Sequence, residues 1–66
     1  MTKREYNITL EQRNGAPAYI VRQLVANVNI ERAWARELEG AQGYITGRLD
    51  GIDVTDYAKL RREQED

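Results

Sequence analysis

Tyr44-Ile-Thr-Gly-Arg-Leu-Asp-Gly-Ile-Asp-Val-Thr-Asp-Tyr57 is the stretch of the chain that decides the predicted fold. Its central Asp50-Gly51 pair suits a two-residue type I′ turn, because both turn positions need a positive φ and glycine has no Cβ to oppose it. Folding about this pair places four apolar residues on one face: Ile45, Leu49, Ile52 and Val54. The sequence therefore predicts an antiparallel hairpin over residues 44–57, with one buried and one polar side.

A second alternating pattern marks the N-terminal region. Between residues 5 and 12, Tyr6, Ile8 and Leu10 fall on one side and polar residues fall on the other. A period of two is typical of a strand with one buried face, so this segment is predicted to be a strand. Asn14-Gly15 follows and fits a tight turn into the next segment.

Residues 18–29 fit two structures. As a strand that pairs back on the first, this segment places Tyr19 opposite Leu10 and Val21 opposite Ile8 across the two-residue turn. As a helix, its apolar residues also recur at helical spacing. The β-branched content favours the strand, and the helix remains open as the alternative.

Residues 30–39 are predicted to form the central helix. Asn29 is a good N-cap, and Gly40 is placed to end the helix in a left-handed conformation. The apolar residues of the helix recur along one stripe, which would pack into the core. This stripe consists of Ile30, Trp34, Leu38 and Ala41.

Together these segments predict a single α+β domain over residues 1–66. A small antiparallel sheet, in the order strand, strand, helix, strand, strand, packs on one central helix, and a short C-terminal helix follows with Tyr57 and Leu60 facing inward. The charged residues 61–66 are expected to fray. A core of this size leaves little stability, so burial of further surface in a homodimer would help to stabilise the fold.

The composition argues against several functions. The 66 residues carry a net charge of −1, so no basic excess favours binding along a phosphate backbone. His, Cys and Ser are absent, which removes the common nucleophile and base combinations and the usual zinc ligands. We therefore expect no enzyme, no cofactor and no metal site. No apolar run is long enough to cross a membrane, and the lack of cysteine fits a cytoplasmic location.

Three aspartates, Asp50, Asp53 and Asp56, recur at every third residue. Their spacing differs from that of a calcium-binding loop, whose first acidic ligands lie two residues apart. Structural roles are predicted instead: Asp50 in the turn, Asp53 paired across the hairpin with Arg48, and Asp56 in the first turn of the last helix.

Residues 35–51 resemble the helix-turn-helix of Cro and repressor-type phage regulators. In that family an Ala in the first helix packs on an apolar residue ten positions on, as Ala35 and Ile45 would here. The resemblance implies that the run Gln42-Gly-Tyr-Ile-Thr46 opens a recognition helix in the DNA major groove. Two glycines in so short a helix would weaken it, so the hairpin is preferred.

The leading functional hypothesis is a small, phage-like regulatory module that binds another protein as an inhibitor or adaptor. Apolar residues on the outer sheet face and exposed Tyr and Arg residues would form the contact, since such residues are common in interfaces. The predicted protein-binding residues are Ile20, Arg22, Leu24, Val28, Tyr44, Arg48 and Tyr57. The alternative is a dimeric helix-turn-helix regulator that contacts DNA through Gln42, Tyr44, Thr46 and Arg48. A third hypothesis is a carrier of an anionic small ligand, which the arginines would clamp.

Overall fold

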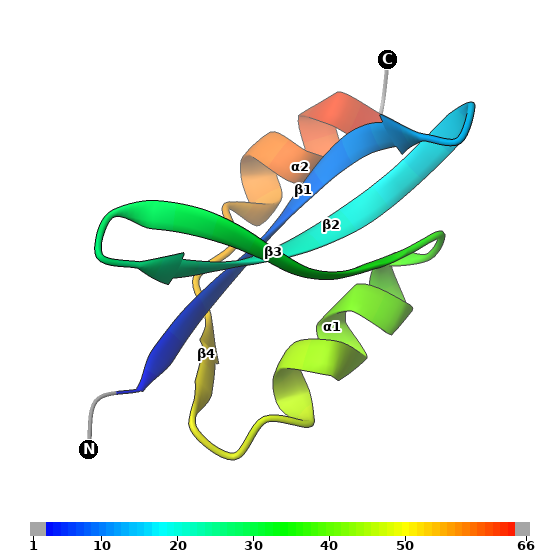
Figure 1. Cartoon of the computed structure of the whole chain (residues 1–66). Coiled ribbons are helices and arrows are strands. Elements are labelled where there is room, and N and C mark those ends of the chain that lie inside the picture. The colour runs from blue at the N-terminus through cyan, green and yellow to red at the C-terminus, as the bar shows by residue number, and fades with distance from the viewer. Residues whose placement is uncertain (1–2, 65–66) are drawn as a thin grey trace.

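Three consecutive strands form the body of a mixed four-stranded sheet, and a helix, a short strand and a second helix follow them (Figure 1). The computed structural model describes residues 3–64. Along this part of the chain the elements are β1 (Arg4–Arg13), β2 (Ala16–Val25), β3 (Val28–Ala35), α1 (Leu38–Thr46), β4 (Gly51–Asp53) and α2 (Tyr57–Gln64). The sheet order is β3-β2-β1-β4, in which β4 runs parallel to β1 and the other pairs are antiparallel. The α+β class is thus confirmed, whereas the predicted element order and the all-antiparallel sheet are not.

The hairpin of β1 and β2 has the predicted turn and register. Asn14 and Gly15 have φ values of 54° and 81°, as a type I′ turn requires. Ile8 lies opposite Val21, and Leu10 lies opposite Tyr19 in the adjacent pair of the same face. The alternating pattern and the turn residues agree here, which is why the register was accessible from sequence.

A second hairpin joins β2 to β3 through Ala26 and Asn27. The strand interpretation of residues 18–29 is correct as far as Val25, after which the chain reverses. Both turn residues have positive φ, 49° at Ala26 and 65° at Asn27. Asn tolerates this conformation, but Ala seldom adopts it because its Cβ crowds the backbone. The turn therefore carries no clear sequence signal.

The predicted helix over residues 30–39 is wrong, because most of this segment is strand β3. Ile30 lies opposite Gln23 and Trp34 lies opposite Ile20, with a register shift between them. This irregularity, of the β-bulge type, moves Trp34 to the other face of the sheet from Ile30. The spacing of four that looks helical in the sequence therefore belongs to an irregular strand. Trp34 is also not part of the core, contrary to the prediction.

The predicted hairpin over residues 44–57 is also wrong. Its first residues complete α1, which buries Ala41 and Ile45 one helical turn apart. Leu49, expected in the core, is fully exposed in the connection that follows. The chain does turn before Gly51, whose N–H donates to the carbonyl of Arg48 at 3.1 Å, but it turns from a helix into β4. Pairing with β1 thus overrides the local preference for a hairpin.

The helix-turn-helix that residues 35–51 resemble, the alternative to the hairpin, is not formed either. Ala35 is the last residue of β3, so no helix precedes α1 in this stretch. β4 follows α1, and only then does α2 begin. Ala35 and Ile45 therefore do not belong to two packed helices.

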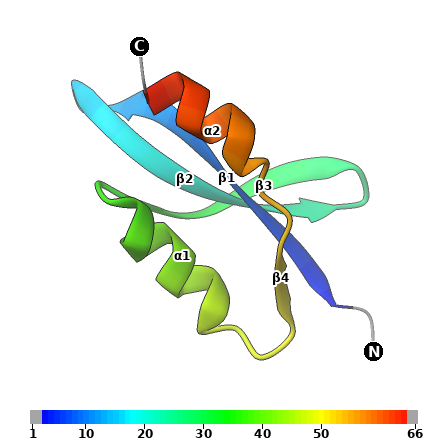
Figure 2. The same cartoon turned by 180° about the vertical axis from the view of Figure 1, so that it is seen from behind.

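Both helices pack on one face of the strongly twisted sheet, and the other face carries no helix (Figures 1 and 2). We call the first the helix-covered face. Its buried core consists of Tyr6, Ile8, Val21, Ala41, Ile45 and Leu60. α2 continues to Gln64, so residues 61–64 of the expected frayed tail are helical, and residues 65–66 lie outside the described part of the chain.

Candidate functional site: the open face of the sheet

The sheet face opposite the helices, called here the open face, brings together side chains from three strands. The strand registers place cross-strand neighbours side by side on this face, and bonds between their side chains agree with the placement. The open face consists of Asn7, Thr9, Glu11, Arg13, Ala18, Ile20, Arg22, Leu24, Asn29, Glu31 and Trp34.

Two apolar residues of the open face are fully buried although no helix covers them. Ala18 and Ile20 both have 0% exposure. They are neighbours of long side chains that form bonds from one strand to another. Arg22 donates to Thr9 and Glu11 of β1, and Arg13 donates to both carboxylate oxygens of Glu31 on β3 at 2.6 and 2.5 Å. The aliphatic stems of such arginines shield apolar surface while their heads stay at the water interface.

The two ion pairs of the open face fix the charge state of their carboxylates. The hydrogen bond from Arg22 is the main cause that lowers the pKa of Glu11, and the bond from Arg13 does the same for the pKa of Glu31. The same bonds raise the pKa of both arginines. All four groups are therefore charged at neutral pH, and each positive charge is matched by a negative one. Neither carboxylate is poised to exchange a proton near neutrality.

Trp34 is the largest exposed apolar side chain of the open face, with 40% of its surface accessible. Two guanidinium groups flank its ring: that of Arg36 lies 4.8 Å from the centroid and that of Arg13 lies 5.6 Å away. Both distances fall in the range of cation–π contacts. Arg36 also donates to the carbonyl oxygens of Ala16 and Pro17 at 3.0 and 3.3 Å. The indole is thus held in one position while part of it remains available to a partner.

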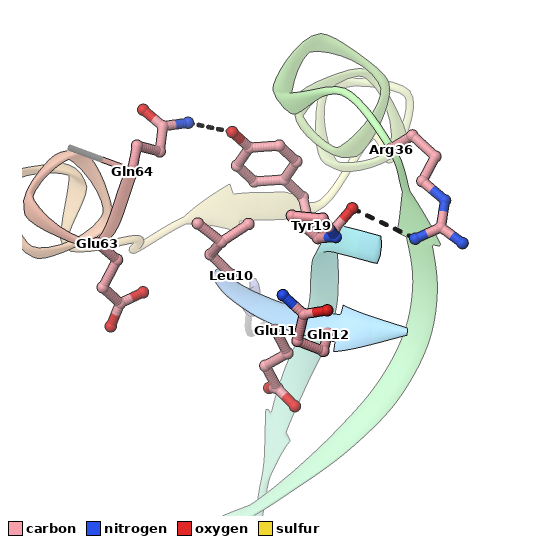
Figure 3. Close-up of a pocket in the computed structure, with 8 residues that line it drawn as sticks. Leu10, Glu11, Gln12, Tyr19, Arg36, Glu63 and Gln64 are labelled. Atoms are coloured by element: carbon pink, nitrogen blue, oxygen red, sulfur yellow. Dashed lines mark hydrogen bonds between the residues drawn. The ribbon is translucent and has the colours of Figure 1, made fainter. Parts of the chain in front are cut away.

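An open groove of about 630 Å³ adjoins this site and shares Arg36 with it. Figure 3 shows Tyr19 and Leu10 in this groove and Arg36 at its side. Gln64 of α2 donates to the Tyr19 hydroxyl, which ties the end of the helix to the sheet. Leu10 and Tyr19 belong to the helix-covered face, so the groove lies mainly between the sheet and α2 and meets the site around Trp34 at Arg36.

The structure divides the predicted protein-binding residues between two sides of the molecule. Ile20, Arg22 and Leu24 lie on the open face. Ile20 is fully buried, so it supports this face rather than offering a contact, whereas Leu24 is exposed. Val28 is exposed next to the β2–β3 turn, opposite Val25.

The other three predicted residues lie on the helix-covered side. The guanidinium of Arg48 sits over the ring of Tyr44, 4.6 Å from its centroid, and donates to the Tyr44 hydroxyl. Tyr57 accepts from Gln42 at 3.2 Å and donates to Asp53. Burial and the bond to Asp53 raise the pKa of Tyr57. The Tyr57 hydroxyl is therefore used within the fold.

The expected pairing of Asp53 with Arg48 is not present. Asp53 instead accepts from the backbone N–H and the hydroxyl of Thr55 and from Tyr57. Asp56 accepts the backbone N–H of Lys59 at 3.1 Å, which caps the start of α2.

The residues of the DNA-binding alternative make contacts within the fold. Gln42 is bonded to Tyr57, and the hydroxyl of Thr46 donates to the carbonyl of Gly43 at 3.2 Å. Only Tyr44 and Arg48 of this set are brought together, and they contact each other.

Sequence reasoning missed Trp34, Arg13 and Arg36 as site residues. The predicted helix placed Trp34 in the core, and Arg13 directly precedes the Asn14-Gly15 turn without a functional signal of its own. One signal was available in Trp34-Ala-Arg36, because residues two apart share a face of a strand. The position of Arg13 beside the ring depends on pairing across three strands and has no local signal.

Searches of family models, of curated proteins and of solved structures find no match for this chain. Within residues 3–64, no helix has the length and apolar character needed to span a membrane. In the same range, no three His, Cys, Asp or Glu side chains gather where they could hold a metal ion.

Proposed function

We propose that this chain is a small non-enzymatic protein-binding module of the inhibitor or adaptor type, which occludes a partner macromolecule with its open face. The observation that carries the proposal is Trp34, part-exposed and held between Arg13 and Arg36. Trp and Arg are the residues most enriched in binding hot spots, and a side chain that is already fixed loses little entropy on binding.

The charges of the open face favour a protein partner over a nucleic acid. Arg13 and Arg22 are neutralised by Glu31 and Glu11, so little positive charge is free to displace counterions from phosphates. A part-exposed indole flanked by arginines and surrounded by paired charges and polar groups is typical of protein interfaces. Binding to duplex DNA, the alternative, should therefore be weak even at low salt.

A homodimer and a cytoplasmic location are further parts of the proposal. Exposed apolar side chains gather where β2 turns into β3, and a second copy would remove them from water. This group consists of Leu24, Val25, Val28 and Ile30. Val28→Glu should then convert a dimer to a monomer in size-exclusion chromatography with light scattering. If the wild-type chain is monomeric at high micromolar concentration, the proposal of a homodimer is wrong, and the proposed role of Trp34 is unaffected.

Capture experiments with matched variants test the binding role. A tagged chain is incubated with lysate of the source cells, and the captured proteins are compared with those held by Trp34→Ala and Arg36→Ala. Both variants should lose the same specific protein, because each removes part of the fixed indole site. Leu49→Ala is the control, since Leu49 is a fully exposed apolar residue outside the open face.

Two outcomes would contradict the proposal. One is a captured protein that Trp34→Ala and Leu49→Ala retain equally. The other is saturable binding of duplex DNA at low salt, seen as a gel-mobility shift, that Trp34→Ala abolishes. That result would show that the open face binds nucleic acid. Circular dichroism of each variant checks that the fold is kept.

A further inference from the structure

Three arginines from distant parts of the chain line one small pocket on the helix-covered side. Arg4 begins β1, Arg32 lies in β3, and Arg48 follows α1. The pocket has a volume of about 180 Å³, and its other lining residues are Tyr6, Gln23 and Tyr44. Tyr6 and Gln23 are both more than nine-tenths buried, so they form a fixed base beneath the exposed guanidinium groups.

Two of these guanidinium groups are held in place by the fold itself. The Nε–H of Arg32 donates to the Gln23 side-chain oxygen at 3.0 Å, which uses the inner edge of the group and leaves its two terminal nitrogens. The guanidinium of Arg48 is fixed on the Tyr44 ring, 4.6 Å from the centroid, and the Tyr44 hydroxyl accepts one of its N–H groups. Tyr44 in turn contacts Tyr6 edge-on, with ring centroids 6.1 Å apart.

The pocket has an excess of positive charge that the open face lacks. Arg4 lies 3.5 Å from the carboxylate of Asp50, and both side chains of this pair are about half exposed. Within residues 3–64, neither Arg32 nor Arg48 has a carboxylate within 4 Å, whereas Arg13 and Arg22 each have one. Like charges held around one pocket repel each other, and a bound anion would offset that repulsion.

We propose that this pocket binds a phosphoryl group, as inorganic phosphate or as a small phosphomonoester. Guanidinium forks match the oxygens of phosphate in paired hydrogen bonds, and groups fixed in advance lose little freedom on binding. The narrow volume suits the phosphoryl group alone, and Arg48 already covers one face of the Tyr44 ring. This site is separate from Trp34 and does not depend on the proposed role of the open face.

An NMR titration tests the site directly. Inorganic phosphate, phosphoserine and acetate are added in separate arms to the 15N-labelled chain at constant ionic strength. The Nε–H signals of Arg32 and Arg48 and the side-chain amide of Gln23 should shift and saturate with phosphate, with a Kd of about 1 mM or below. Saturation by phosphoserine as well would identify a monoester site, and saturation by inorganic phosphate alone would identify a site for the free anion.

Matched arginine variants distinguish phosphate binding in this pocket from a general effect of surface charge. Arg32→Gln and Arg48→Gln should each weaken phosphate binding by roughly tenfold, since each removes charged hydrogen bonds. Arg61→Gln and Arg62→Gln remove the same charge from the exposed end of α2 and should leave the affinity unchanged. Trp34→Ala should also leave it unchanged.

Three results would overturn the phosphate site. The first is the absence of saturable shifts up to about 10 mM phosphate, well above the expected Kd. The second is saturation by acetate with equal affinity, which would remove the preference for a phosphoryl group. The third is an equal loss of phosphate affinity in Arg32→Gln and Arg61→Gln, which would show that phosphate binding depends on net charge and not on this pocket.

Discussion

The two faces of the same sheet are buried by different means. On the helix-covered face, Ile8 and Val21 pack beneath two helices with other apolar side chains. On the open face, Ala18 and Ile20 are equally buried, but only by side chains of the sheet itself. Long, paired arginines and glutamates take the place of a third layer there. Within residues 3–64 both helices lie on the other face, so the cover of the open face comes from side chains.

This difference has a consequence for function. The part of a face that is packed under helices is closed to a large partner, whereas a cover of paired side chains leaves an indole and several polar groups at the surface. The buried floor keeps these groups in position. We therefore expect the helix-covered core to determine stability and the open face to determine binding of the protein partner.

Truncation of Ile45 should have the largest effect on stability. This residue is almost fully buried between α1 and the sheet, and Ile45→Ala should lower the free energy of unfolding by about 4 kcal/mol. Urea denaturation measures the loss, and Ile45→Val, at about 1 kcal/mol, serves if the larger truncation does not fold. Leu49→Ala should have almost no effect, because Leu49 is fully exposed. A comparable loss of unfolding free energy in Ile45→Ala and Leu49→Ala would show that Ile45 is not part of the core.

The matching truncation on the open face should cost less. Ile20 is as buried as Ile45, but no helix packs on it; its cover consists of partly exposed side chains of the sheet, among them its cross-strand neighbour Trp34, which can close over a cavity more readily than a packed helix. We expect Ile20→Ala to lower the free energy of unfolding by about 2.5 kcal/mol, near the low end for such truncations. Equal losses for Ile20→Ala and Ile45→Ala in the same denaturation experiment would show that the two covers are equally rigid.

Glycine substitutions probe the junction between α1 and β4. A Cβ on Gly51 would lie 3.2 Å from the Ile45 carbonyl oxygen and 3.2 Å from the Tyr6 ring. Gly51→Ala should therefore destabilise the chain by about 2 kcal/mol. Gly43 lies within α1 with nothing within 4 Å of its Cβ position, so Gly43→Ala should stabilise by about 0.5–1 kcal/mol. Thermal melting gives both values, and stabilisation by Gly51→Ala would contradict the close packing.

The first half of the fold could be predicted from sequence because its local signals agree. Alternation in β1 and β2 and the Asn14-Gly15 turn all indicate the same hairpin, and its register is as predicted. From Ala26 onwards the local sequence signals are weaker or predict a different secondary structure from the one that forms. Ala26 forms a turn that its type disfavours, and the register shift in β3 gives Ile30 and Trp34 a spacing that looks helical.

The C-terminal half depends on contacts that local patterns do not report. Asp50-Gly51 is an ordinary hairpin signal, but β4 pairs with β1, nearly fifty residues away in the sequence. Such tertiary pairing routinely overrides local preference. Local patterns could not predict the candidate site either, because Arg13, Trp34 and Arg36 meet only once three strands are in register.

Acidification should affect the open face before the helix-covered core. Glu11 has a folded-state pKa below its ordinary value of 4.5, so its contribution to stability is present above that pH and is lost as the pH falls through the lowered value. Arg22→Met should raise the Glu11 pKa towards 4.5, as read from carboxyl 13C shifts. Arg13→Met is the matched variant and should act mainly on Glu31. An unchanged Glu11 pKa in Arg22→Met would mean that the ion pair is not formed in solution.

The position of Trp34, the one tryptophan in the sequence, distinguishes an irregular β3 strand with an exposed indole from a helix with a buried one. NOEs from the indole protons in the folded chain should connect Trp34 to the side chains of Arg13 and Arg36, with none to Ala41 or Ile45. NOEs from the indole to the methyl groups of Ala41 and Ile45 would place Trp34 in the core. That result would contradict both the irregular β3 strand and the binding surface built on it.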